Sequence, residues 1–373
     1  MEPQSDPGGA ATEPPPPAGK SSERLRRLRV GAVLAMVLAF GIVIAGIIVN
    51  VNRTAVPGSP PSGTSAQANS THTATPSVSE PPAPPAPAAP AVPLPPVLPG
   101  LPTTPMNILL IGSDMRGDAR AAAEYTATTG QPSDHRSDSL ILIHIPADHQ
   151  RIYGISIMRD LWVDIPGYGA SKINASLEVG GVPLVAQAVG SLLNTRIDHT
   201  VMLDFNGLKT LTDFLGGVDV NVTVPFTSTH DTHHYFPAGV NKLDGQAALE
   251  FVRERYAFID GDYQRVRNQQ TFVRAIMATL VNSGTLNDPA RTLGFITSVA
   301  PYLVVDQGFD VLNLAGLAYG LRGVDPGAAV FFTLPTAGTG FSSTGQSILF
   351  PDYAGIAAVS AALAEGRLAE YGP

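Results

Sequence analysis

The chain has 373 residues, none of them cysteine, and its formal net charge is −8. The absence of cysteine excludes thiolate nucleophiles, Cys-X-X-Cys redox motifs and zinc sites with cysteine ligands. The acidic balance argues against nucleic acid as a partner, because binding to a phosphate backbone needs a basic surface.

The N-terminal part of the chain has the composition of a membrane anchor. Residues 1–29 are rich in proline, glycine and serine, and we interpret them as a cytoplasmic tail. They end in a basic cluster that consists of Lys20, Arg24, Arg26, Arg27 and Arg29. Residues 30–52 carry no charged side chain and are almost wholly apolar. About 20 such residues span a bilayer core as a helix, so we predict one transmembrane helix over 30–52.

A cleaved signal peptide is the alternative for this segment. Its apolar part would be shorter, about 7–15 residues, and would end in a small-residue cleavage site, for which no convincing pattern follows here. A retained anchor is therefore favoured. Because the basic cluster precedes the helix, the positive-inside tendency predicts a single-pass protein of the cell membrane with a cytoplasmic N-terminus and an extracytoplasmic remainder.

Residues 53–105 are interpreted as a linker. They contain 16 prolines and only two residues of definite charge, Arg53 and Glu80. Such a composition builds no core and favours polyproline II, a semi-rigid spacer that extends about 3.1 Å per residue. We expect a tether that lets the following domain work beyond the lipid surface. The alternative is that this segment drifted to a low-complexity composition and that its length has no function.

Residues 106–373 form the predicted folded domain. Apolar runs typical of strands occur at 107–114, 139–146, 151–158, 200–205, 217–224 and 329–336. Most of these runs are continuous rather than alternating, which indicates strands that are buried on both faces. Helical patterns occur at 182–194, 206–217, 243–255, 262–282 and near 352–369. Helices on both sides of such strands predict an α/β fold, a three-layer α-β-α sandwich with a central mixed sheet.

Charged residues lie directly against three of the apolar runs. Asp114 ends the first run, and Arg159 follows the third. Arg136 and Asp138 precede the second run. In α/β domains, polar residues at strand ends and on adjoining loops usually form the functional site. A structural ion pair would explain any one of these places, but the three together favour a site.

A second concentration of charge occurs in "FVRERYAFIDGDYQRVRNQQ", residues 251–270. It contains four arginines, namely Arg253, Arg255, Arg265 and Arg267. One interpretation is a solvated helix face on which the arginines pair with neighbouring acids: Glu250, Glu254, Asp260 and Asp262. The other interpretation is that the arginines bind an anion.

Helical geometry bears on the choice between these interpretations. Asp244 and Asp262 are expected to cap the helices 243–255 and 262–282. In the second helix Asp262, Arg265 and Gln269 fall at i, i+3 and i+7, on one face. Arg253 and Arg255, two residues apart, would point the same way only in an extended segment, and the sequence leaves that conformation open.

Arginines combined with isolated carboxylates indicate phosphate chemistry. Arginine is the fork-shaped donor for phosphate, and Mg²⁺ is held by a few carboxylates together with water and phosphate oxygens. The pattern therefore predicts a pyrophosphate clamp, and stabilising a phosphoryl group in transfer needs little else from a protein. The stretch "HDTHHY", residues 230–235, could bind a metal, but a polar loop is the preferred interpretation.

The order and spacing of several stretches resemble the LytR–CpsA–Psr family. These stretches are "MNILLIGSDMR", "RSDSLILIHI", "ISIMRDLWVDIPG", "KINASLEVGG", "DFNGLKTLTDFLGGVDVNV", "AGVNKLDGQAALEFVRER" and "GDYQRVRNQQ". The resemblance is close over about 106–282 and looser towards the C-terminus. It implies a cell-wall glycopolymer ligase, a phosphotransferase that moves a glycopolymer from a polyprenyl-pyrophosphate carrier onto peptidoglycan and leaves a phosphodiester link.

The resemblance also implies roles for individual residues. The family's metal ligands fall on Asp114 and Asp138, with Mg²⁺ as the cofactor and Mn²⁺ as a second option. Its pyrophosphate-contacting residues fall on Arg136, Arg159, Arg253, Arg255, Arg265 and Gln269. Arg159, Arg265 and Asp262 are the implied catalytic residues, and Asp262 is a candidate for polarising the acceptor hydroxyl. The lipid tail would lie in an apolar tunnel under the sheet.

Two other functions stay open at this point. The first is a pyrophosphatase that acts on polyprenyl diphosphates, with water in place of the glycan acceptor. The second is a non-catalytic, membrane-tethered binder of lipid-linked wall precursors, or a regulator of wall genes. A regulator fits poorly with an acidic external domain that has no DNA-binding motif. The glycopolymer itself, whether teichoic acid, arabinogalactan, capsule or another, is not specified by the sequence.

Overall fold

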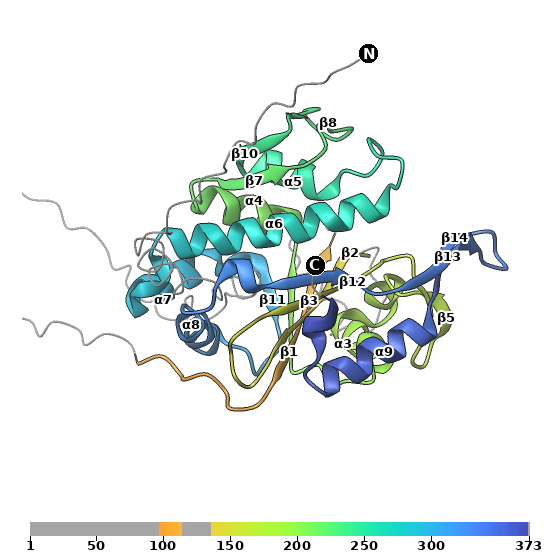
Figure 1. The fold of residues 1–373 in the computed structure, drawn as a ribbon, viewed down its shortest axis with the longest axis horizontal. Helices are drawn as coiled ribbons and strands as arrows, with labels where there is room; N and C mark the ends of the chain where they lie inside the picture. Colours follow the sequence, from red (N-terminus) through yellow and green to blue (C-terminus); the bar gives the residue numbers. More distant parts are fainter. Residues whose placement is uncertain (1–96, 114–135, 372–373) are drawn as a thin grey trace, which may run out of the picture.

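The computed structural model describes residues 97–113 and 136–371 (Figure 1). The predicted transmembrane helix over 30–52 and the predicted metal ligand Asp114 lie outside these residues, as does most of the predicted linker. The end of that linker is described, and it packs against the folded domain: Leu98 and Leu101 contact the hydrophobic core. The helix Val311–Gly320 packs closely against the end of the linker, because a Cβ atom added to Gly316 would lie only 2.4 Å from the Pro99 carbonyl oxygen.

A six-stranded mixed sheet forms the centre of the domain. Its strand order is β11-β6-β1-β2-β3-β12. The strands are β1 (Met106–Ser113), β2 (Ser137–Ile145), β3 (Tyr153–Ile157), β6 (His199–Leu203), β11 (Leu303–Val305) and β12 (Val330–Thr333). The β1–β6 and β3–β12 pairs are parallel, and the other three are antiparallel. The predicted central mixed sheet is confirmed, and it contains five of the six predicted strands.

The sixth predicted strand, at 217–224, lies outside this sheet. It forms β7 (Val218–Val222), which pairs with β10 (Gly239–Leu243) in a two-stranded ribbon. Buried and exposed residues alternate along β7, as expected for a strand with one solvated face. The other small ribbons are β4 (Trp162–Ile165) with β5 (Gly169–Lys172), β8 (Phe226–Thr227) with β9 (Tyr235–Phe236), and β13 (Thr336–Phe341) with β14 (Ser347–Pro351).

Helices cover both faces of the central sheet (Figure 1). Successive residues of β1 belong to different hydrophobic clusters: Leu110 faces one and Leu109 the other. The first cluster packs under α4 (Phe205–Phe214), α5 (Gly245–Arg253), α6 (Asp262–Asn282), α7 (Pro289–Val299) and α8 (Val311–Gly320). The second packs against α3 (Ala175–Leu192) and α9 (Tyr353–Ala364). Short 3-10 turns lie at Thr285–Asn287, Ala300–Tyr302, Pro326–Ala328 and Leu368–Tyr371.

Within the described ranges, α3 alone is long and apolar enough to pass a length-and-composition test for a membrane span. Its geometry and packing are those of a helix that covers a sheet. Gly181, with φ 65° and ψ −167°, interrupts the helix, and Pro183 follows the interruption. Val185 and Val189 are fully buried in the second cluster. The helix predicted over 182–194 corresponds to the part after this break.

Candidate functional site

One edge of the central sheet carries a pocket with about 980 Å³ of space between its walls, part of it open to solvent. Parallel β1 and β6 both end at this edge, and antiparallel β2 begins there, so Ser113, Asp204 and Asp138 come together. Helices α4 and α6 and the end of α5 complete the walls.

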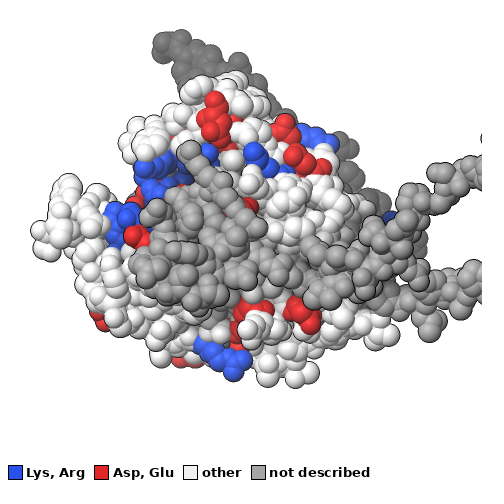
Figure 2. All heavy atoms as spheres, turned by 180° about the vertical axis from the view of Figure 1, so that it is seen from behind, with Lys and Arg blue, Asp and Glu red and all other residues white. Residues whose placement is uncertain are grey.

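Most of the site residues that the sequence predicted line this pocket. Its walls include Asp138, Arg159, Arg253, Arg255, Arg265 and Gln269. Asp262 is not among the lining residues, but it contacts three of these arginines, as described below. Arg136 is not among the lining residues: its Nε lies 3.1 Å from Glu178 Oε2, and its side chain is 56% exposed. Figure 2 shows basic side chains gathered on part of the surface with acidic ones beside them.

Asp262 connects three of the arginines. Its Oδ1 lies 3.0 Å from Arg265 Nη1 and 3.5 Å from Arg255 Nη1, and its Oδ2 lies 3.8 Å from Arg159 Nη2. The predicted helix cap at Asp262 is wrong, because Gly261 occupies the cap position and Asp262 is the first helical residue. The carboxylate turns towards the guanidinium groups instead of the free backbone N–H groups. Asp244, by contrast, caps α5 as predicted, accepting from the Ala247 N–H at 2.8 Å.

Arg159 sits among three carboxylates. It donates to Asp138, and its Nε lies 3.6 Å from Asp160 Oδ2. Burial lowers the pKa of Arg159, but the nearby charges of Asp138, Asp262 and Asp160 outweigh burial and raise it. Asp160 is held in turn by Lys172, whose Nζ lies 2.8 Å from Asp160 Oδ1. Arg159 is therefore a permanently charged and firmly oriented group.

Arg265 is the most buried of the arginines in the pocket wall. Its side chain is 5% exposed. Burial, together with the positive charge of Arg159, lowers its pKa. The Nε atoms of Arg265 and Arg159 are both buried and have no hydrogen-bond partner within the described part of the chain. Arg159 Nε still faces a carboxylate, Asp160 Oδ2 at 3.6 Å. Buried donors are nearly always paired, so the unpaired N–H of Arg265 indicates a missing acceptor.

The directions of Arg253 and Arg255, which the sequence left open, follow from the end of α5. The helix ends at Arg253, and Glu254 has extended backbone angles, φ −64° and ψ 131°. Both arginines consequently line the pocket. Arg253 stacks over the Phe205 ring at 4.6 Å, and Arg255 lies over the Tyr256 ring at 4.4 Å.

The alternative of a solvated arginine face holds for Arg267. This side chain is 50% exposed, donates to Asp260 and Gln264, and points into a separate groove on the other side of α6. The pairing of arginines with Glu250 and Glu254, which belonged to that alternative, is not found among the described residues. Both are fully buried, and they accept hydrogen bonds from the backbone of residues 229–234 and 255–257.

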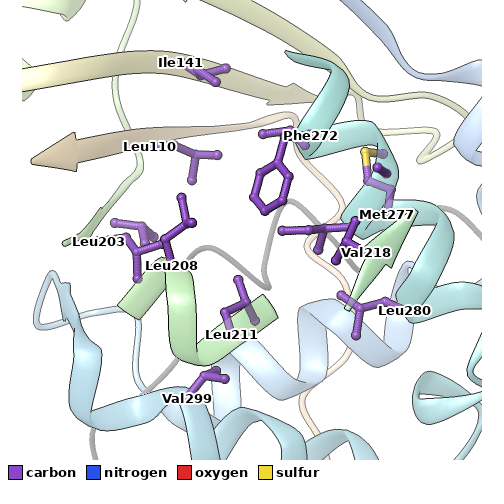
Figure 3. Packing of buried hydrophobic residues seen from close by; sticks show 14 of the residues in the cluster. Leu110, Ile141, Leu203, Leu208, Leu211, Val218, Phe272, Met277, Leu280 and Val299 are labelled. Atoms are coloured by element: carbon purple, nitrogen blue, oxygen red, sulfur yellow. The ribbon is translucent and has the colours of Figure 1, made fainter. Parts of the chain in front are cut away.

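The inner part of the pocket is apolar. Its walls there are Leu110, Ile141, Leu203, Leu208, Val252, Phe272 and Val273. Figure 3 shows Leu110, Leu208 and Phe272 facing one another between the sheet, α4 and α6. The pocket thus runs from a charged mouth to an aliphatic interior. The sequence could not separate these residues from ordinary core. It also gave no sign that Asp204 and Tyr256 line the pocket.

The chain belongs to the LytR_cpsA_psr family, whose profile matches residues 65–365. It is 35% identical over 218 residues to the probable cell wall biosynthesis protein LcpB of Corynebacterium glutamicum, an alignment that covers 58% of this chain and 52% of LcpB. It is 31% identical over 217 residues to the polyisoprenyl-teichoic acid–peptidoglycan teichoic acid transferase TagU of Enterococcus faecalis, covering 58% of this chain and 66% of TagU. The chain therefore spans about half to two thirds of these relatives.

Solved structures share the fold. The crystal structure of B. subtilis TagV matches with a TM-score of 0.60 and 24% identity over 73% of this chain and 100% of that chain. A structure of TagT bound to LIIa-WTA matches with a TM-score of 0.52 and 22% identity, covering 70% and 90%. The mixed α/β architecture is thus the family's architecture.

Proposed function

We propose that the protein is a transferase that moves a glycopolymer from a polyprenyl-pyrophosphate carrier onto peptidoglycan and leaves a phosphodiester link. One observation carries this proposal: a single pocket joins a mouth lined by four arginines to an aliphatic interior. A polyprenyl pyrophosphate has the same two parts. The TagU relatives, named as polyisoprenyl-teichoic acid–peptidoglycan transferases, support the assignment.

The charged mouth suits the electrostatics of phosphoryl transfer. The acceptor hydroxyl attacks the phosphorus next to the glycan and loses its proton to water, the bond to the bridging oxygen breaks, and polyprenyl monophosphate leaves. Negative charge accumulates on the phosphoryl and bridging oxygens during this step. Arg159 and Arg265 are held by carboxylates before substrate arrives, so they stabilise that charge without reorganising.

Asp262 is better suited to orienting the arginines than to polarising the acceptor. Its two oxygens already face three guanidinium groups. We therefore assign Asp262 the role of fixing Arg159, Arg255 and Arg265 relative to one another.

We further propose Mg²⁺, or Mn²⁺ in its place, as the cofactor, with Asp114 and Asp138 as its protein ligands. The described part of the chain contains no group of three or more His, Asp or Glu side chains that could hold a metal by itself. Asp138 nevertheless fits, because its carboxylate lines the pocket mouth and is 26% exposed. Mg²⁺ typically takes only one or two carboxylates and completes its shell with water and substrate phosphates. When bound, it would neutralise pyrophosphate charge.

The membrane topology is part of the same proposal. A helix over 30–52 would anchor the chain with its N-terminus in the cytoplasm, and the folded domain would act outside. The proline-rich segment would let the domain reach both the lipid-borne substrate and the peptidoglycan.

A reconstituted transfer reaction tests the proposal. The full chain in detergent is mixed with a short-chain polyprenyl-pyrophosphate glycan, Mg²⁺ and peptidoglycan oligomers, and mass spectrometry follows the phosphodiester product and the polyprenyl monophosphate. Release of monophosphate without an acceptor product would point to the pyrophosphatase. Binding without turnover would point to the non-catalytic binder. Leu208→Trp, which fills the aliphatic interior, should weaken the binding of long-chain substrates more than that of short-chain substrates.

A further inference from the structure

The loop between β8 and β9, residues 228–234, reaches the proposed substrate pocket. We name it the histidine loop, because it contains His230, His233 and His234. Of these, His230 lines the pocket mouth beside Arg253 and Arg255, whereas His233 and His234 do not line it.

Two buried glutamates hold the histidine loop in place. Glu250 accepts the backbone N–H groups of Thr232 at 3.0 Å and His234 at 3.1 Å. Glu254 accepts the N–H of Thr229 at 2.5 Å. Burial alone would raise the pKa of Glu250, but hydrogen bonds from Thr232 and Gln246 and from backbone N–H groups lower it to about 2. The loop is therefore anchored by ionised carboxylates from α5 and its end.

The backbone of the loop is also unusual. Asp231 and His233 have positive φ angles of 42° and 56°, in the region that favours glycine. Such conformations persist where the surroundings hold them, and they concentrate at functional sites. Asp231 is additionally joined to the pocket wall, because its Oδ2 lies 3.2 Å from Arg253 Nη1 and 3.1 Å from Gln246 Nε2. The loop and the arginine wall are thus one connected unit.

The His230 ring presents an unsatisfied nitrogen. Its Nε2 is buried and has no hydrogen-bond partner among the described residues. Six side-chain atoms of the described chain share that property, and three of them belong to pocket residues: Arg159 Nε, Arg265 Nε and His230 Nε2. The two arginine atoms are obligate N–H donors. Arg159 Nε still faces the Asp160 carboxylate at 3.6 Å, whereas the unpaired nitrogens of Arg265 and His230 are explained together by an acceptor with several anionic oxygens.

We infer that His230 is a direct substrate-binding residue of this pocket, donating a hydrogen bond from Nε2–H to a phosphoryl oxygen of the pyrophosphate. The inference rests on the proposed function and deepens it, because it adds a donor that the motif residues do not include. In this arrangement the glutamates and Asp231 position the loop, and His230 alone of the loop side chains contacts the substrate.

Binding measurements test this role. The full chain in detergent micelles is titrated calorimetrically with geranylgeranyl pyrophosphate and Mg²⁺, and with geranylgeraniol as the phosphate-free reference. His230→Ala and His230→Phe should bind the pyrophosphate about 10- to 100-fold more weakly, as expected for one lost hydrogen bond to a charged group. His230→Gln, whose amide nitrogen reaches a similar position, should recover most of the affinity. His234→Ala is the matched control.

A spectroscopic measurement complements the variants. The ¹⁵N signal of His230 Nε2, identified by its loss in His230→Gln, should shift on addition of the pyrophosphate but not of geranylgeraniol. Unchanged binding in both His230→Ala and His230→Phe would overturn the inference while leaving the proposed function intact. Equal loss in His230→Gln and His230→Ala would refute hydrogen-bond donation. If the wild-type chain showed no preference for the pyrophosphate over the alcohol, the proposed function itself would fail.

Discussion

Replacing Arg265 by lysine separates positive charge from guanidinium geometry at the most buried point of the pocket wall. Arg265 is 5% exposed, its Nη1 lies 3.0 Å from Asp262, and its buried Nε has no hydrogen-bond partner among the described residues. One planar group therefore contacts a carboxylate with one edge and keeps a second donor unused in the pocket wall. A lysine ammonium is a single point and reaches one of these positions, not both.

The expected loss follows from removing one oriented donor. Such a donor is worth about 10²–10³ in kcat, which corresponds to about 2.7–4 kcal/mol of transition-state stabilisation. Arg265→Lys should therefore lower kcat by about that factor while KM changes much less. Folding should be little affected, because Asp262 keeps Arg159 and Arg255 as partners.

Single-turnover transfer from a short-chain polyprenyl-pyrophosphate glycan measures the effect, with thermal unfolding as the check on folding. Arg267→Lys is the matched control, because Arg267 lies two residues further along α6, is 50% exposed and faces the other groove. It should stay within about threefold of the wild type, since exposed ion pairs contribute about 0–1 kcal/mol. Equal losses in the two folded variants would refute the argument from the helix face.

Three further predictions concern the metal, the loop and the tether. Asp138→Ala should abolish transfer that depends on Mg²⁺, and full activity in chelator would contradict the metal assignment. The Glu250 pKa of about 2, below its usual 4.5, means that the ionised group stabilises the fold above pH 4.5 and that this contribution is lost as pH falls towards 2. Urea unfolding should show Glu250→Gln destabilised at pH 7 by at most about 3 kcal/mol, with the difference from wild type vanishing near pH 2. Deleting 61–90, which spares the packed Leu98 and Leu101, should preserve turnover in detergent but reduce attachment of polymer to the wall in cells; equal loss in both assays would contradict a tether.

Continuous apolar runs were sufficient to predict most of the central sheet, because strands buried on both faces leave a strong signal. The strand at Leu303–Val305 was missed because three residues at a sheet edge are too few to form a pattern. The run at 217–224 was predicted as a strand, but its partner could not be known. The alternation of Val218, Asp219 and Val220 is consistent with its place in a half-exposed ribbon.

In the site, too, local sequence patterns predicted some features, whereas other features depend on contacts between residues that are distant in the sequence. Helical periodicity placed Arg265 and Gln269 on one face, strand ends marked Asp138 and Arg159, and all four residues line the pocket. The directions of Arg253 and Arg255 depended instead on the backbone of one residue, Glu254, whose extended conformation is fixed by contacts with the histidine loop. Those contacts join residues 25 positions apart, and no local pattern encodes them.

The two interpretations of the arginine-rich segment turn out to be compatible in this structure. Pairing with acids would compete with ligand binding if one carboxylate occupied all the N–H donors of an arginine. An arginine, however, has five N–H donors arranged around a plane, so a carboxylate on one edge leaves the rest available. Asp262 contacts Nη1 of Arg265, while the Nε donor of Arg265 has no hydrogen-bond partner among the described residues. The acids therefore fix the plane of the guanidinium group, and this orientation prepares the remaining donor for phosphate.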